Sequence, residues 1–263
     1  METVNATLSL YANAAVHAAR GFPKTLLALL VLFAGTAALI GVELLFFEPM
    51  GDGFISRIGR ALLQDVFLGT YLSLIGLWVL AGRSILPRHI RLHAGNLFIP
   101  LLTVVFYFWI ARMLLGFTGI PRAGLLLVVA ALVVNPIPEV LYQDRQDGTY
   151  ALQQAFTFLS KNWPEWLVAQ IPWVVALTVW QVVFGGGPDV DVIARLWIET
   201  GASMEALHIP SILMWPLDPS NALGFAGGAL LLVMVHYFFL FRGYLYRELS
   251  KGNRRLRAWQ SRM

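Results

Sequence analysis

The feature that most constrains this chain is the apolar stretch from Ala123 to Gln143, because two prolines interrupt it. Twelve apolar residues, Ala123 to Val134, come first, and the run NPIPE from Asn135 to Glu139 follows before apolar character resumes. A helix of that length rises only about 18 Å, whereas the hydrocarbon core of a bilayer is about 30 Å thick. A membrane span built from this stretch must therefore hold its proline break at membrane depth.

The two prolines of this break, Pro136 and Pro138, determine what must surround it. Each proline lacks a backbone donor and so frees a carbonyl one turn earlier in the helix. Lipid cannot satisfy a freed carbonyl, so neighbouring helices, a side chain or water must do so. The sequence therefore predicts a bundle of helices packed around the stretch.

The composition of the chain indicates a membrane protein. Of its 263 residues, 58% are hydrophobic and only 13% are charged, whereas soluble domains carry about 25% charged residues. Cysteine is absent, which excludes disulfides, iron–sulfur clusters, thiolate zinc sites and a cysteine nucleophile. Residues 1–20 lack the apolar core of a cleavable signal peptide, so we expect the first span to serve as both insertion signal and anchor.

We predict an all-α fold, in which residues 1–263 form a single integral-membrane domain with six transmembrane helices in three hairpins. The expected spans are residues 24–47, 61–81, 97–116, 123–143, 165–185 and 221–245, each close to the roughly 20 residues that a span requires. Residues 149–162 are expected to form an amphipathic helix along the membrane surface. The outer segment, residues 186–220, is either a docking surface or a lid over the outer end of the bundle.

The distribution of basic residues predicts the orientation. With both termini in the cytoplasm, most of the 19 lysines and arginines, Arg242 among them, fall on the cytoplasmic side, as the positive-inside rule requires. We therefore expect a bacterial-type inner membrane protein with both termini cytoplasmic. The basic tail, residues 246–263, is expected to contact anionic lipid headgroups or a protein partner, but no nucleic acid, through Lys251, Arg254, Arg255 and Arg257.

Three ionisable residues lie toward the outer ends of predicted spans. Glu43 and Asp65 lie in the first and second spans, and Arg112 lies in the third. Either carboxylate could therefore meet Arg112 at a similar depth in the membrane. The pair would be a structural ion pair that makes the buried arginine tolerable, or part of a proton or ion relay.

Asn135 and Glu139 differ from these residues because they lie beside broken backbone. Discontinuous helices with a nearby carboxylate form substrate and ion sites in many transporters, so these residues either bind a solute or mark a structural break. If the break is only structural, Glu139→Gln should be nearly silent. His236, in the sixth span, is a further candidate relay residue, and the alternative is a hydrogen bond inside the bundle.

Neither the histidines nor the sequence patterns of known catalytic sites indicate a metal site or an enzymatic activity. His89 and His93 are spaced i, i+4 but have no third ligand nearby in the sequence, so we expect no metal site and no other cofactor. No serine, histidine and acid occur at the spacing of an intramembrane protease, and no phosphate-binding glycine loop precedes a helix. The chain is therefore predicted to be non-enzymatic.

The stretch from Ala151 to Phe184 joins an amphipathic helix to the pair Trp163-Pro164 and then to a long apolar span, and Ala12 to Phe47 echoes this order. In this pattern the chain resembles the multi-pass membrane domains associated with bacterial glycerophosphodiester phosphodiesterases and related stand-alone six-span proteins. The resemblance implies an all-helical membrane module without a characterised active site. The soluble catalytic barrel of those enzymes has no room in this chain.

These observations predict a subunit or scaffold of a larger membrane complex, with membrane lipids and other membrane protein subunits as its partners. The alternative is a small transporter or permease component that uses the broken fourth helix. The two alternatives differ in what they expect of the bundle. A scaffold should have its buried charges paired, whereas a transporter should have a polar cavity that reaches Glu139.

Overall fold

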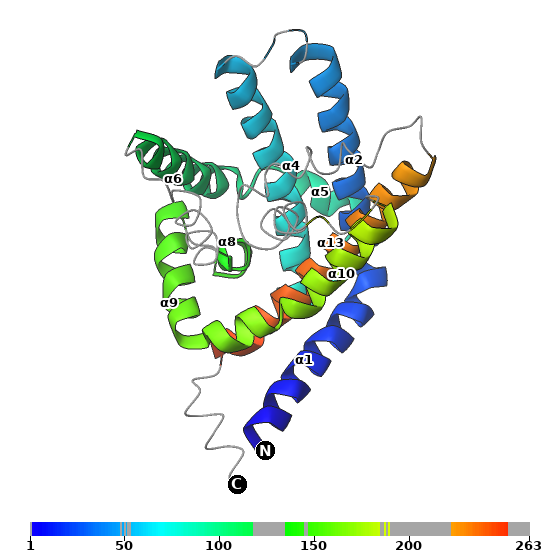
Figure 1. Cartoon of the computed structure of the whole chain (residues 1–263), viewed down its shortest axis with the longest axis vertical. Helices are drawn as coiled ribbons and strands as arrows, with labels where there is room; N and C mark the ends of the chain where they lie inside the picture. The colour runs from blue at the N-terminus through cyan, green and yellow to red at the C-terminus, as the bar shows by residue number, and fades with distance from the viewer. Residues whose placement is uncertain are drawn as a thin grey trace.

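The computed structural model describes residues 2–47, 54–117, 135–144, 147–184 and 222–251, together with residues 49, 51, 187 and 189. The regular elements in these ranges are all helical, and no strand occurs among them. The prediction of an all-α fold is therefore confirmed for the described part of the chain. Figure 1 shows the helices crossing one another at several angles.

The elements follow one another as α1 (Glu2–Gly21), the 3-10 turn η1 (Phe22–Thr25), α2 (Leu26–Val42), the π-helical turn η2 (Glu43–Phe47), α4 (Phe54–Ala81), α5 (Pro87–His93), α6 (Phe98–Phe117), α8 (Ile137–Asp144), α9 (Gly148–Val168), α10 (Ile171–Phe184) and α13 (Ala222–Lys251).

Among the described residues, three helices are long and apolar enough to cross a membrane: Asn5–Phe46, Ala61–Ala81 and Phe225–Lys251. Two bent pairs qualify when each pair is taken as one span. They are Pro87–His93 with Phe98–Tyr107, bent by 53°, and Gly148–Val168 with Ile171–Phe184, bent by 48°. The structure is thus that of a membrane protein with three to five candidate spans in its described part. The arrangement with six spans stays a prediction, because most of the fourth predicted span lies outside the described residues.

The first predicted span, residues 24–47, is the second part of a much longer helical segment. This segment runs for 42 residues from Asn5 to Phe46, or about 63 Å at 1.5 Å per residue. Pro23 lies in the 3-10 turn where α1 passes into α2, and the hydroxyl of Thr25 bonds back to the carbonyls of Gly21 and Phe22 at 3.1 Å. Because the segment is far longer than a bilayer is thick, α1 must extend beyond the membrane or lie obliquely to it.

The boundary expected between a surface helix and the fifth span coincides with a kink in the structure. We expected a surface helix over residues 149–162 and a span from Glu165. α9 includes residues from both sides of this boundary, but its backbone is non-helical at Asn162 (φ −128°, ψ 15°), just before Pro164, as the predicted boundary requires. The bend of 48° follows at Ala169–Gln170, where Pro172 has no backbone donor to offer the preceding turn. Figure 1 shows the corner between α9 and α10.

The last described helix, α13, lies at the centre of the bundle. It packs against α1, α2, α4, α8, α9 and α10, and in Figure 1 it runs beside α10. Its ring of Phe238 stacks on Trp173 of α10 with centroids 4.4 Å apart, while Leu232 and Leu240 are completely buried. Since the short helix α8 packs on α4, α9 and α13, the described end of the broken segment, from residue 135 onward, lies inside the bundle, as expected.

Candidate functional site

The helix that follows the proline break, α8, places its polar residues inside the protein. Asn135 and Pro136 form a turn, and the carbonyl of Pro136 accepts a hydrogen bond from the backbone N–H of Val140 at 3.1 Å. Asn135 and Glu139 are both buried, with at most 1% of either residue exposed. The break therefore brings an amide and a carboxylate into the core.

The partner of the Glu139 carboxylate is Arg242 of α13. Arg242 Nη2 lies 2.7 Å from Glu139 Oε2, and both side chains are buried. The same nitrogen donates a hydrogen bond to the backbone carbonyl of Asn135. The carbonyls that Pro136 and Pro138 would free are those of residues 132 and 134, which lie outside the described residues, so the prediction that a neighbouring group satisfies them stays a prediction.

Aromatic rings surround the guanidinium group of Arg242. Its central carbon lies 5.2 Å from the ring centroid of Trp166 and 5.6 Å from those of Phe238 and Phe239. The faces of aromatic rings attract cations, more strongly when water is excluded. These rings and the Glu139 carboxylate together stabilise the buried positive charge.

The side chain of Asn135 ties the break to the corner between α9 and α10. Its oxygen Oδ1 accepts hydrogen bonds from Trp166 Nε1 and, at 3.5 Å, from Gln170 Nε2. Trp166 thus contacts both halves of the site, through its ring N–H to Asn135 and through its ring face to Arg242. The arrangement joins α8, α9 and α13 at one point.

The side chains of Glu139 and Arg242 are closed off from solvent and fixed by the groups that surround them. One oxygen of Glu139, Oε1, has no hydrogen-bond partner among the described residues. A cavity of about 350 Å³ lies nearby, but the residue of α8 that lines it is Tyr142, and Glu139 does not reach it. This cavity is therefore not the polar cavity that a transporter would need at Glu139.

His236 forms a separate buried site between three elements. Its Nε2 lies 2.9 Å from the Thr25 hydroxyl of η1, and its Nδ1 lies 2.9 Å from the Tyr71 hydroxyl of α4. When Thr25 gives its one hydroxyl proton to the carbonyl of Gly21 or Phe22, each 3.1 Å away, Nε2 is the donor to Thr25 and Nδ1 accepts from Tyr71. The structure thus places His236 in hydrogen bonds inside the bundle, and its role as a relay stays a prediction.

The predicted ion pair of Arg112 with Glu43 or Asp65 is only partly visible. Asp65 is completely buried in α4, and neither of its carboxylate oxygens has a hydrogen-bond partner among the described residues. The side chains of Glu43 and Arg112 lie outside the described residues. Since α4 packs against both η2 and α6, the three residues belong to adjacent elements, and their pairing stays a prediction.

The basic tail begins as a continuation of α13. This helix extends to Lys251, beyond the end predicted for the sixth span at residue 245. Lys251 lies 3.9 Å from Glu248, and both side chains are exposed. Arg254, Arg255 and Arg257 lie outside the described residues.

No group of three or more metal-ligating side chains occurs in the ranges that the structure describes. The rings of His89 and His93 lie edge to face with centroids 6.5 Å apart. His89 caps the start of α5, where its Nδ1 accepts a hydrogen bond from the backbone N–H of Leu86.

Sequence reasoning missed Arg242 as the partner of Glu139 and counted it with the cytoplasmic basic residues. The signal was present, because Arg242 stands within the run FFLFRGYLY from Phe238 to Tyr246. A single arginine enclosed by apolar and aromatic residues within a span is typical of a buried charge with a partner. Trp166 and Gln170 gave no comparable signal, since tryptophan and glutamine near the end of a helix are ordinary.

Comparison of the chain with models of protein families, with curated proteins and with solved structures finds no match, so the resemblance to the membrane domains of the phosphodiesterase group stays a prediction.

Proposed function

We propose that this chain is a non-enzymatic, multi-pass protein of a bacterial-type inner membrane and acts as a subunit or scaffold of a larger membrane complex. The observation that carries this proposal is the buried pair of Glu139 and Arg242. A carboxylate that binds a solute must be reachable, whereas this one is enclosed and opposed by an arginine. The charged groups at the break therefore serve to join α8 to α13.

The exposed faces of two helices suggest where partners and lipid lie. On α10, the exposed apolar residues are mainly valines, among them Val175, Val179 and Val183, which suit contact with lipid tails. On α6, Phe106 and Trp109 are exposed and stack with ring centroids 6.3 Å apart. Aromatic residues are enriched in protein interfaces, so we assign the partner-binding surface to α6.

The test is purification of the full chain in a mild detergent from its own membranes. We expect a defined membrane protein to co-purify in fixed ratio. The change Phe106→Ala with Trp109→Ala should release this partner, and the matched change Val175→Ala with Val179→Ala on α10 should retain it. A parent chain that purifies without a protein partner would contradict the proposal.

The second candidate function is a small transporter or permease component. One observation favours it, namely that Glu139 Oε1 has no hydrogen-bond partner among the described residues. This oxygen is a hydrogen-bond acceptor beside the broken backbone, and it could bind a proton or a cation. Solute binding by the purified chain that is lost in Glu139→Gln, with folding retained, would favour this function over the scaffold.

A further inference from the structure

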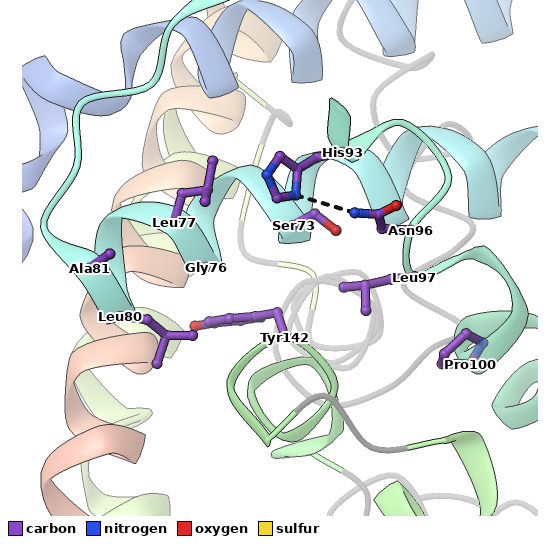
Figure 2. A pocket seen from close by; sticks show the side chains of 10 residues that line it. All are labelled: Ser73, Gly76, Leu77, Leu80, Ala81, His93, Asn96, Leu97, Pro100 and Tyr142. Atoms are coloured by element: carbon purple, nitrogen blue, oxygen red, sulfur yellow. Dashed lines mark hydrogen bonds between the residues drawn. The ribbon is translucent and has the colours of Figure 1, made fainter. Parts of the chain in front are cut away.

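A cavity of about 350 Å³ lies where α4 ends and the segment leading into α6 begins (Figure 2). It is lined by Ser73, Gly76, Leu77, Leu80 and Ala81 of α4, by His93, Asn96, Leu97 and Pro100 around the start of α6, and by Tyr142 of α8. The candidate span of α4 ends at Ala81, and α6 begins at Phe98. The cavity therefore lies at the depth of one membrane boundary.

The lining of this cavity has a polar side and an apolar side. His93 and Asn96 lie together in Figure 2, joined by a hydrogen bond of 3.3 Å between Asn96 Nδ2 and His93 Nδ1. Tyr142 and Leu80 lie across the cavity from them. Leu80 is also exposed at the protein surface, so the apolar side continues outward. Such a lining suits an amphipathic molecule with a polar end and an apolar tail.

The apolar floor of the cavity is a ring held in a fixed position. A Cβ atom at Gly76 would lie 3.1 Å from Tyr142 Cδ2, and one at Gly243 would overlap the Tyr142 hydroxyl. The ring thus lies between α4 and α13 in a space that two glycines leave open. Because the ring is buried and held from both sides, the cavity has a rigid floor.

The charge around the cavity indicates the sign of its ligand. Residues 82–100, which connect α4 to α6, contain Arg83, Arg88 and Arg91 but no acidic residue. All three arginines are exposed. Basic residues grouped at a membrane boundary attract anionic lipids, and a cavity of this volume is within the range of small-molecule sites. A phosphate group near His93 and Asn96 would bind beside the connection that carries these three arginines, although none of them lines the cavity itself.

We propose that this cavity binds one anionic phospholipid, with its phosphate near His93 and Asn96 and its acyl chains leaving past Leu80. The assignment is independent of the scaffold function, because neither Glu139 nor Arg242 lines this cavity. It also differs from general attraction of the basic tail to headgroups, because it assigns one lipid to one site.

The test uses the purified, delipidated full chain and native mass spectrometry with added phosphatidylglycerol. Phosphatidylcholine and inorganic phosphate form the other arms of the experiment. We expect one phosphatidylglycerol molecule to bind in preference to phosphatidylcholine, and inorganic phosphate neither to bind nor to compete. Asn96→Ala should weaken phosphatidylglycerol binding about tenfold, the equivalent of one hydrogen bond, because it removes the amide that bonds to His93 Nδ1 and holds that ring in the cavity wall. Gln154→Ala, which removes an exposed amide on α9, should leave binding unchanged.

A second variant, Ser73→Phe, places a ring in the cavity and should abolish the complex with one lipid. If Ser73→Phe does not fold, Asn96→Ala still tests the proposal. Asn96 is exposed, so its replacement should not prevent folding. Equal binding of the two lipids, or unchanged affinity in Asn96→Ala, would overturn the proposal. Competition by inorganic phosphate as strong as that of phosphatidylglycerol would also overturn it, because the ligand would then be free phosphate.

Discussion

Arg242 Nη2 donates a hydrogen bond of 2.7 Å to Glu139 Oε2 across 103 positions of the sequence, inside a bundle that excludes water from both side chains. This contact changes what Glu139 can be expected to do. From the sequence, a structural break predicted that Glu139→Gln would be nearly silent. With Arg242 opposite, the same change leaves a buried arginine without its counter-charge, so a structural role now predicts a large effect.

The first prediction is therefore a double-mutant cycle between Glu139 and Arg242. Glu139→Gln and Arg242→Gln should each destabilise the folded chain by about 3–5 kcal/mol, the usual cost of breaking a buried ion pair. The double variant should recover part of this loss, because it leaves no unpaired charge. Thermal unfolding in detergent, with the folded yield from size-exclusion chromatography, measures all three variants.

The control for this cycle is Glu248→Gln, which removes the same charge from an exposed pair with Lys251. Exposed pairs contribute about 0–1 kcal/mol, so its unfolding temperature should stay close to that of the parent chain. Losses of Glu139→Gln and Arg242→Gln that simply add in the double variant would show that the two residues do not act as a pair.

A second prediction concerns the buried hydrogen bonds of His236. His236→Leu should destabilise the chain by about 1–3 kcal/mol, because the Tyr71 hydroxyl loses its partner in the core. Adding Tyr71→Phe should recover part of the loss, since no hydroxyl is then left unsatisfied. Adding Thr25→Val should give no recovery, because Thr25 keeps its bonds to the carbonyls of Gly21 and Phe22. Equal recovery by both second changes would argue against this network.

A third prediction tests the close packing of α13 against α8. Gly243→Ala should destabilise the chain, because the added Cβ would overlap the Tyr142 hydroxyl. Tyr142→Phe in the same chain should recover part of the stability by removing that oxygen. Gly41→Ala in α2 is the matched control, since nothing lies within 4 Å of its added Cβ, and it should be neutral or stabilising. Unfolding temperatures of these three variants and of the parent chain measure these differences, and a Gly243→Ala chain as stable as Gly41→Ala would contradict the packing.

A fourth prediction concerns topology. Arg242 is buried and no longer supports the charge count, but most of the other basic residues still lie on one side of the proposed membrane. Reporter fusions at Met263 and near Pro188 should therefore give opposite answers, with the terminus in the cytoplasm. The same answer from both positions would contradict an arrangement with six spans.

The sequence predicted the features that depend on a short run of neighbouring residues better than those that depend on contacts between distant helices. The second predicted span coincides with the candidate span Ala61–Ala81, because the length of a continuous apolar run directly indicates whether a helix can cross the bilayer. The kink at Asn162 was predicted from Trp163-Pro164, whereas the bend of 48° between α9 and α10 was not, although Pro172 stands beside it. The end of α13 was placed too early for a related reason. In the structure Arg247 donates a hydrogen bond to the backbone carbonyl of Val79 in α4, a contact between distant residues that the sequence does not indicate.

The residues of the candidate site also fall into those that the sequence identified and those that it did not. Asn135 and Glu139 were identifiable because broken backbone and a carboxylate stand together in one short run. Their partners come from α9 and α13, so their distance from Glu139 depends on how helices pack, which a single sequence does not contain. Arg242 was the exception, because its apolar surroundings in the sequence already suggested burial.

The most direct measurement for the central claim uses the neutral double variant Glu139→Gln with Arg242→Gln, purified in parallel with the parent chain. If the pair only joins α8 to α13, the double variant should fold and co-purify with the same membrane partner in the same ratio as the parent. A double variant that is folded and inserted but has lost a solute-binding or transport activity that the parent possesses would contradict the account, and would assign Glu139 to transport.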